Sequence, residues 1–174
     1  MQGIPLNERK RLGALLDDRP QTEVMAMIPQ FSQAETDNFV APPAKIPEAL
    51  GVLMFNMERG VNLPEIQEFL RDCPDIQPFD VILANELDDG CARSGNKNTA
   101  RELAQAFGLN YAWGLEFIEL VNDENAKGFH GNAVFSRWPI RRAGVIRLPE
   151  QYNWYFDRQK RIGGRLAVFA ELDV

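Results

Sequence analysis

From residue 50 onward, apolar and polar positions alternate in blocks that predict strand, helix and strand in turn. Residues 51–55 (GVLMF) form a short apolar run that ends at Asn56, residues 63–72 form an amphipathic helical stretch, and residues 79–86 (FDVILANE) form a second apolar run. We expect two buried parallel strands joined by a right-handed crossover helix. Their carboxyl ends would then bring Asn56 and Glu86 to the same edge of a sheet, with a polar turn after Glu86.

The rest of the chain predicts a helix and further strands. Thr99 begins a capping-box pattern for a helix that Gly108 ends. Single strands are expected over residues 110–120 and 165–174. Between them, residues 133–136 and 141–148 are expected to form a strand pair with Pro139 at the bend.

Residues 1–49 differ in character and are interpreted as a leader to a main domain at residues 50–174. Asn7 is expected to cap a short helix through Leu16, and a second helical piece covers residues 22–31. Pro42, Pro43 and Pro47 mark an extended connector. The leader suggests no function, and packing across the domain surface is the simplest expectation.

Composition narrows the class of protein. The 174 residues suffice for one domain with a substantial core, and 45% hydrophobic with 25% charged residues is typical of soluble globular proteins. No apolar run is long enough for a membrane span, and the charged N-terminus does not fit a secretory signal. Cys73 and Cys91 are isolated and the chain has one His, which argues against a zinc site and Cys–His catalysis and indicates a reducing, cytoplasmic location.

Charge is unevenly distributed along the sequence. The formal net charge is −6. The segment 137–165 holds eight basic residues (Arg137, Arg141, Arg142, Arg147, Arg158, Lys160, Arg161, Arg165) against two acidic ones (Glu150, Asp157). Two interpretations stay open for this segment: a solvated basic face, or a rim that faces phosphate groups.

Five segments in order resemble a known family: GVLMFN, FDVILANE, RSGNKNTARELAQAFG, HGNAVFSRWPI and GRLAVFAEL. From about residue 50 to 174 the chain resembles the endonuclease/exonuclease/phosphatase superfamily of deoxyribonuclease-like, magnesium-dependent phosphoesterases. The resemblance implies an α/β fold, namely the first half of a four-layer α/β/β/α sandwich with a mixed sheet and outer helices. It also implies that the enzyme hydrolyses a phosphodiester or a phosphomonoester.

The resemblance implies roles for individual residues. Glu86 would bind Mg²⁺ or Mn²⁺, which suits a carboxylate, and Asn56 would orient Glu86 or a phosphate oxygen. From the residues alone, Glu86 could equally be a solvated strand-end charge and Asn56 an Asx turn. Arg165, Arg93 and Asn132 are candidate substrate-binding residues.

Other residues invite a role but are interpreted as structural. His130 lies in the HGNA segment, where a hydrogen-bonded loop role is preferred over that of a general base. Tyr152, Trp154, Tyr155 and Phe156 could stack on a base or sugar, although partial core burial is preferred.

The chain departs from the family in one respect. The family's later His, Asp-x-Asn and terminal Asp-His motifs are missing, so we expect an N-terminal part of the domain that is weakly active or inactive. The final strand should then leave an unpaired edge or an exposed apolar face at Ala167 and Phe169. The alternative function is a non-catalytic module that recognises phosphate on the same fold. The substrate, small molecule or nucleic acid, stays undetermined, and no obligate protein partner can be inferred.

Overall fold

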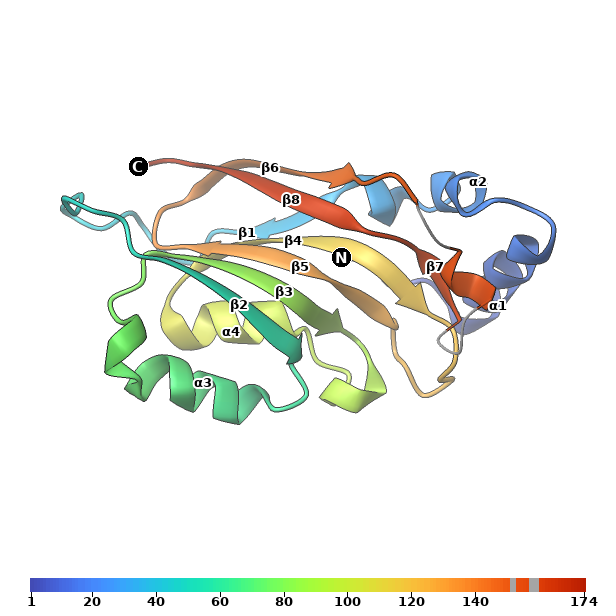
Figure 1. Ribbon diagram of the computed structural model, residues 1–174, viewed down its shortest axis with the longest axis horizontal. Coiled ribbons are helices and arrows are strands. Elements are labelled where there is room, and N and C mark those ends of the chain that lie inside the picture. Colours follow the sequence, from blue (N-terminus) through green and yellow to red (C-terminus); the bar gives the residue numbers. More distant parts are fainter. Residues whose placement is uncertain (151–152, 157–159) are drawn as a thin grey trace.

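Two stacked β-sheets organise the chain, and helices α3 and α4 cover the face of the larger sheet opposite the smaller one (Figure 1). The computed structural model describes residues 1–150, 153–156 and 160–174. The helices are α1 (Leu6–Ala14), α2 (Gln21–Ala26), α3 (Leu63–Asp72) and α4 (Thr99–Phe107). The strands are β1 (Ala34–Asp37), β2 (Val52–Arg59), β3 (Val81–Asp89), β4 (Asn110–Glu119), β5 (Phe129–Ser136), β6 (Ile140–Arg147), β7 (Arg161–Gly163) and β8 (Leu166–Leu172).

The larger sheet is mixed, as expected for this α/β fold. Its strand order is β1-β4-β5-β3-β2, and β7 also pairs with β4. Strands β2 and β3 are parallel with α3 between them in sequence, which confirms the predicted strand–helix–strand unit, and the remaining pairs are antiparallel. Helix α3 packs on this unit through Phe69, whose ring stacks on Phe55 of β2.

The smaller sheet consists of β6 and β8 and lies against β4 and β5. The contact is close at Gly114, where a Cβ atom would lie 2.6 Å from Val145 Cγ1 and 2.9 Å from Val168 Cγ2. The predicted pairing of residues 133–136 with 141–148 is wrong, because β5 pairs with β3 and β4 while β6 pairs with β8. Trp138 fills the interface between the sheets at the point where the chain crosses from one to the other.

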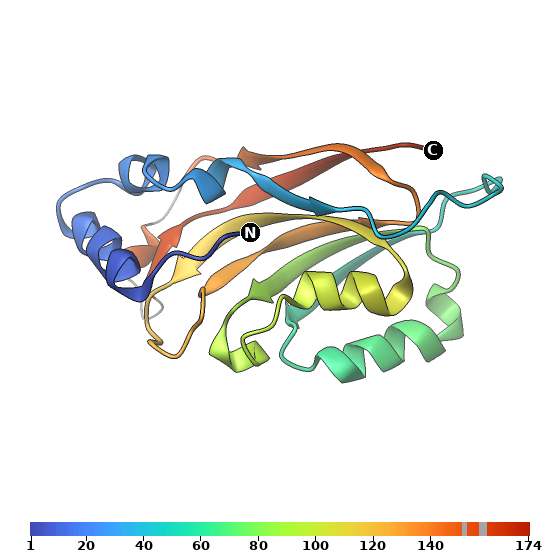
Figure 2. The same ribbon diagram turned by 180° about the vertical axis from the view of Figure 1, so that it is seen from behind.

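The N-terminal segment is built into the same core. Strand β1 extends the larger sheet beside β4, and Leu12, Val24 and Phe31 join the main hydrophobic cluster. The division at residue 49 therefore does not coincide with a boundary in the core. Helix α1 begins at Leu6 behind Pro5, so the prediction that Asn7 caps it is wrong. Figure 2 shows α1 and α2 at one end of the molecule and β1 along the edge of the larger sheet.

Two local predictions need correction. The first strand is not buried on both faces, since Val52 and Met54 are 58% and 76% exposed while Leu53 packs on the core. Strand β2 is an edge strand that the smaller sheet does not cover. Helix α4 is capped by Asn98, whose side chain accepts a hydrogen bond from the Arg101 N–H, because the Thr99 hydroxyl instead donates to the Asp88 carbonyl.

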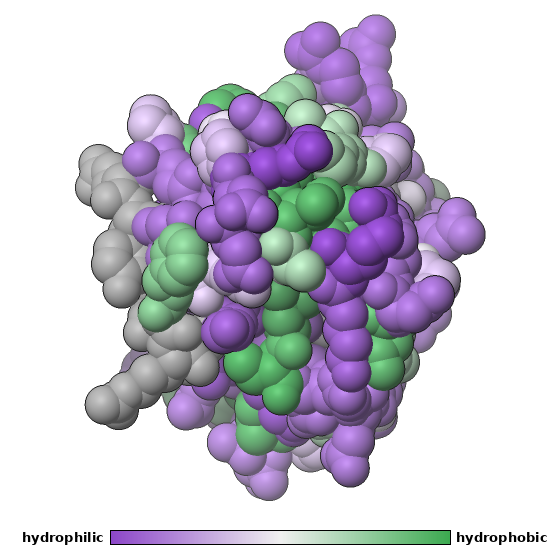
Figure 3. Space-filling model, turned by 90° about the vertical axis from the view of Figure 1, so that its right-hand side faces the viewer, coloured by the Kyte–Doolittle hydropathy of each residue, from purple (hydrophilic) through white to green (hydrophobic). Residues whose placement is uncertain are grey.

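The outer face of the smaller sheet is open to solvent. Ala167, Phe169 and Ile146 are exposed there, as predicted for the final strand. At the end of the molecule that carries α1, α2 and β7, apolar residues form a band between polar ones (Figure 3). Within the described ranges, no helix combines the length and apolar character needed to cross a membrane.

Candidate functional site

Three bulges lie side by side across the larger sheet and determine where polar side chains emerge. Strand β2 has one extra residue between Asn56 and Arg59, β3 has one between Ala84 and Leu87, and β4 has one between Leu115 and Phe117. A bulge bends a strand and re-aims its side chains. The bulges in β3 and β4 contain Glu86 and Glu116, and the bulge in β2 begins at Asn56.

Glu86 lies within its strand and not at the strand end. Its φ is +59°, a left-handed conformation that is uncommon for a residue with a side chain and that costs conformational energy. Its N–H donates to Asn132 Oδ1 at 3.1 Å across the β3–β5 pair. The predicted polar turn after Glu86 is wrong, because Leu87 and Asp88 are buried and β3 continues to Asp89.

Asn56 forms the Asx turn that was one of its two interpretations, while its role in a site stays a prediction. Its Oδ1 accepts the N–H of Glu58 at 2.9 Å, as in an Asx turn. Glu58 and Arg59 follow with φ of +46° and +67°, so the backbone turns sharply directly after Asn56. The same Asn56 side chain also lines a cleft that Glu86 shares.

This cleft has a volume of about 230 Å³ and collects residues from six strands or their ends. Its lining residues are Asn56, Asn85, Glu86, Glu116, Asn132, Leu148, Arg165 and Leu166. The structure thus brings together four of the five residues singled out in the sequence, from positions more than a hundred residues apart. We call this space the polar cleft.

A hydrogen-bond network connects one side of the polar cleft. Asn132 Nδ2 donates to Glu116 Oε2 at 3.4 Å, and Arg165 Nη1 forms an ion pair with Glu116 Oε1 at 2.9 Å. The Glu116 side chain is 4% exposed, whereas that of Arg165 is 61% exposed. The carboxylate is therefore held inside the sheet while the guanidinium reaches into the open part of the cleft.

Glu116 is the site residue that sequence reasoning missed. It lies in the apolar segment NYAWGLEFIEL, and a buried acid is rare unless it is paired. A charged residue inside an otherwise apolar strand was the available signal. The partner that makes its burial tolerable, Arg165, is 49 residues away and could not be recognised from spacing.

Arg93 does not join the polar cleft, so we remove it from the candidate set. Its guanidinium binds both carboxylate oxygens of Asp88, at 2.7 and 2.9 Å, and contacts Glu119 at 3.3 Å. Burial opposes ionisation of Asp88, but hydrogen bonds from His130 and Arg93 outweigh it and lower the Asp88 pKa. Arg93 therefore has a structural task that explains its position.

His130 is also structural. It lies in strand β5, not in a turn, and its Nδ1 is 2.7 Å from Asp88 Oδ1 in the interior. Its ring stacks on Phe117, with 4.4 Å between the ring centroids. Because it is buried and outside the polar cleft lining, it is badly placed for a general base.

The basic segment 137–165 does not form one rim in the part of the chain that the structure describes. Arg141 and Arg142 pair with Glu171 on the outer face of the smaller sheet, whereas Arg147 donates to backbone carbonyl groups in the interior. Arg165 alone among the described members lines the polar cleft. Arg158 lies outside the described residues.

The described members of the aromatic group Tyr152, Trp154, Tyr155 and Phe156 differ in burial. Tyr155 is buried, as preferred from the sequence, while Phe156 is exposed. Tyr152 and the side chain of Trp154 lie outside the described residues. This cluster therefore supplies no described ring to the polar cleft.

The polar cleft contains oxygen ligands that suit a hard divalent cation. Glu86 and Glu116 supply carboxylates and Asn56 an amide, and Mg²⁺ commonly uses one or two carboxylates with water and substrate phosphate. Glu116 is already compensated by Arg165, so Glu86 is the carboxylate of the cleft better suited to such a cation. Among the residues described, no three His, Cys, Asp or Glu side chains are grouped as a metal site.

Comparisons with known proteins give one structural likeness. No protein-family model matches the chain, and no curated protein matches it either. A crystal structure described as an endonuclease/exonuclease/phosphatase from Beutenbergia cavernae DSM 12333 is similar, with a TM-score of 0.49 and 21% sequence identity. The match covers 71% of this chain and 34% of that chain, so this chain spans about a third of that protein's length.

Proposed function

We propose that the protein is a divalent-metal-dependent phosphoesterase that hydrolyses a phosphodiester or a phosphomonoester in the polar cleft. The observation that carries this proposal is that Asn56, Glu86, Asn132 and Arg165 line one small cleft beside Glu116. The strained backbone at Glu86 supports the proposal, because such strain is concentrated at functional sites.

Each side chain has a distinct task in this proposal. Glu86 holds Mg²⁺ or Mn²⁺ together with water molecules. When bound, such an ion would supply stabilisation of the negative charge on the phosphoryl oxygens and on the leaving oxygen. Arg165 contacts a phosphate oxygen, since guanidinium groups suit this geometry, and Glu116 fixes its position. Asn56 donates a hydrogen bond from its amide nitrogen to Glu86 or to a phosphate oxygen. Asn132 fixes the backbone of Glu86, because its Oδ1 accepts the Glu86 N–H.

We expect slow turnover from the chain in this form. The lining of the polar cleft includes no imidazole, and the only His of the chain is committed to Asp88. General acid–base catalysis typically contributes a factor of about 10²–10⁴ to a rate. Without an imidazole, this contribution would have to come from a carboxylate of the cleft, and Glu116 is already paired with Arg165.

The test compares Glu86→Gln with Glu68→Gln, an exposed control on α3. Hydrolysis of bis(p-nitrophenyl) phosphate and p-nitrophenyl phosphate is measured with Mg²⁺, with Mn²⁺ and with EDTA. Binding of Mn²⁺ is measured separately by electron paramagnetic resonance. We expect metal-dependent turnover and Mn²⁺ binding that Glu86→Gln abolishes and Glu68→Gln preserves. Equal Mn²⁺ binding by both variants would refute the role of Glu86.

A non-catalytic phosphate-recognising module is the second candidate. The observations that favour it are the absence of a three-ligand metal group among the described residues and the engagement of Glu116 by Arg165. Such a module would bind inorganic phosphate in a salt-sensitive way, and Mg²⁺ would not change the affinity. Phosphate titration with and without Mg²⁺, using Arg165→Gln as the comparison, separates it from the enzyme.

A further inference from the structure

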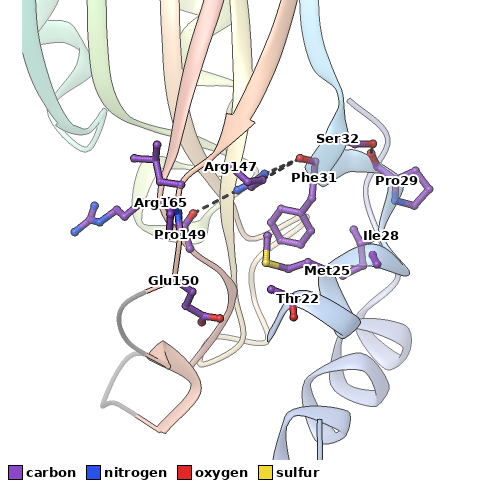
Figure 4. A pocket seen from close by; sticks show the side chains of 13 residues that line it. Thr22, Met25, Ile28, Pro29, Phe31, Ser32, Arg147, Pro149, Glu150 and Arg165 are labelled. Atoms are coloured by element: carbon purple, nitrogen blue, oxygen red, sulfur yellow. Dashed lines mark hydrogen bonds between the residues drawn. The ribbon is translucent and has the colours of Figure 1, made fainter. Parts of the chain in front are cut away.

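An apolar pocket of about 460 Å³ adjoins the polar cleft. Met25, Ile28, Pro29 and Phe31 form one wall, and Pro149, Glu150 and Arg165 lie on the opposite side (Figure 4). Leu148 and Gly164 also line the pocket. The volume falls within the range of about 300–1,000 Å³ that is usual for small-molecule sites. The N-terminal segment thus builds a cavity for which the sequence suggested no role.

Of the two arginine residues that line this pocket, Arg147 is fully engaged by the protein. Arg147 donates to the Phe31 carbonyl from Nε at 3.0 Å and from Nη2 at 2.9 Å, and it also donates to the carbonyls of Leu115, Glu116 and Gly164. Its guanidinium carbon lies 4.7 Å from the centre of the Phe31 ring. Burial lowers the Arg147 pKa to about 10. The pocket therefore offers a ligand chiefly hydrocarbon surface.

The carboxylate on the pocket lining restricts the ligand further. Glu150 lines the pocket, and burial raises its pKa. A second phosphate group in this pocket would meet that carboxylate and would find Arg147 already bound to carbonyl groups. The lining consequently favours an uncharged apolar group over a polyphosphate or a nucleic-acid backbone.

Two residues connect the pocket with the polar cleft. Leu148 and Arg165 line both spaces. In Figure 4 the Arg165 guanidinium points away from Met25 and Phe31, and its Nη1 binds Glu116 in the polar cleft. A ligand can therefore place an anionic group beside this guanidinium and extend an apolar group past Leu148 into the pocket.

We propose that the substrate is a phosphate ester of an apolar alcohol, with its phosphate in the polar cleft and its hydrocarbon group in the apolar pocket. This inference rests on the proposed function and names its substrate class. Burial of one methylene stabilises binding enough to raise affinity about fourfold. Affinity for n-alkyl phosphate compounds should therefore rise about fourfold for each added methylene until the pocket is filled.

The test uses n-alkylphosphonates from methyl to octyl, which are not hydrolysed, so that binding is measured without turnover. Dissociation constants are obtained by calorimetry below the micelle concentration of each compound. Ala26→Trp fills the pocket from the exposed end of α2, and Glu23→Trp places the same side chain on α2 outside the lining. We expect the chain-length dependence in the wild type and in Glu23→Trp, and its loss in Ala26→Trp with methylphosphonate binding unchanged.

Two results would overturn the inference: affinity independent of chain length in the wild type, or a dependence that persists in Ala26→Trp. Neither result involves hydrolysis. Failure of the proposed catalytic function would appear separately, as unchanged Mn²⁺ binding in Glu86→Gln. Vesicles that contain phosphatidic acid distinguish the source of the ester. Binding to these vesicles would indicate that the ester is a membrane lipid. Binding of the short phosphonates alone would indicate a soluble ester, and either result supports the proposal.

Discussion

Replacement of Arg147 by Met should destabilise the protein more than any other single arginine substitution on β6. Its guanidinium donates to four carbonyl groups from three parts of the chain, which are Phe31 of the N-terminal segment, Leu115 and Glu116 at the β4 bulge, and Gly164 before β8. A bulge interrupts the ladder of strand hydrogen bonds. Arg147 thus binds carbonyl groups at and around this bulge, including that of Glu116, which also accepts the Gly164 N–H.

The magnitude follows from the number of acceptors. A hydrogen bond that involves a charged group contributes about 1.5–3 kcal/mol, and a buried carbonyl left without a partner costs about 1–3 kcal/mol. These costs overlap and water can reach some of the carbonyls, so we expect a loss of about 3–5 kcal/mol in the free energy of unfolding for Arg147→Met. Methionine retains most of the apolar stem, which keeps the cavity term small. Arg147→Lys should lose about half as much, because an ammonium group reaches fewer of the acceptors.

The assay is urea unfolding at pH 7 monitored by tryptophan fluorescence. With a slope of about 2 kcal/mol per molar urea, Arg147→Met should lower the midpoint by about 1.5–2.5 M. Arg142→Met is the matched control, since Arg142 lies on the same strand, is largely exposed and pairs with Glu171 at the surface. The control should change the free energy of unfolding by less than about 1 kcal/mol. If both variants unfold at similar urea concentrations, the reasoning about the buried guanidinium is refuted.

Three further changes test other contacts. Gly114→Ala should lower the free energy of unfolding in urea by about 1–3 kcal/mol, because the alanine Cβ would collide with Val145 and the sheets would have to separate. An unchanged urea midpoint would contradict the close contact between the sheets. The Asp88 pKa is lowered in the folded state, so the contribution of Asp88 to stability is present above about pH 4 and is lost as pH falls through the folded pKa. Asp88→Asn should therefore lower the free energy of unfolding by about 3–5 kcal/mol at pH 7 and flatten its decline below pH 4. Parallel curves of stability against pH for the wild type and the variant would argue against this role. Phe169→Ser should leave stability within about 1 kcal/mol and reduce fluorescence of the dye ANS, because Phe169 is 40% exposed on the open face; undiminished fluorescence would show that the dye binds elsewhere.

Local patterns were sufficient to predict most elements. The apolar spacing and the proline of the first turn placed α3 at Leu63–Asp72, as observed. The parallel pairing of β2 with β3 followed from the order strand, helix, strand. That pairing also predicts that Asn56 and Glu86 lie close together, and both residues line the polar cleft.

Pairing between distant segments was not readable from the sequence. Strand β1 has four residues, AETD, with no apolar alternation, and it forms a strand only because β4 offers an open edge. Strands β5 and β6 are close in sequence but belong to different sheets, since Trp138 is buried between the layers and separates them. Tertiary burial therefore overrode the short connection that suggested a hairpin.

By itself, the sequence determined the apolar and polar faces of the elements and supplied the carboxylate and amide groups of the candidate site. The tertiary structure alone decided that bulges in neighbouring strands aim those groups into one cleft, that Glu116 belongs there and that Arg93 does not. The physical reason is that periodicity depends on neighbours along the chain. Bulges and buried ion pairs, in contrast, depend on strands brought together from distant positions, where each buried charge or carbonyl needs a partner.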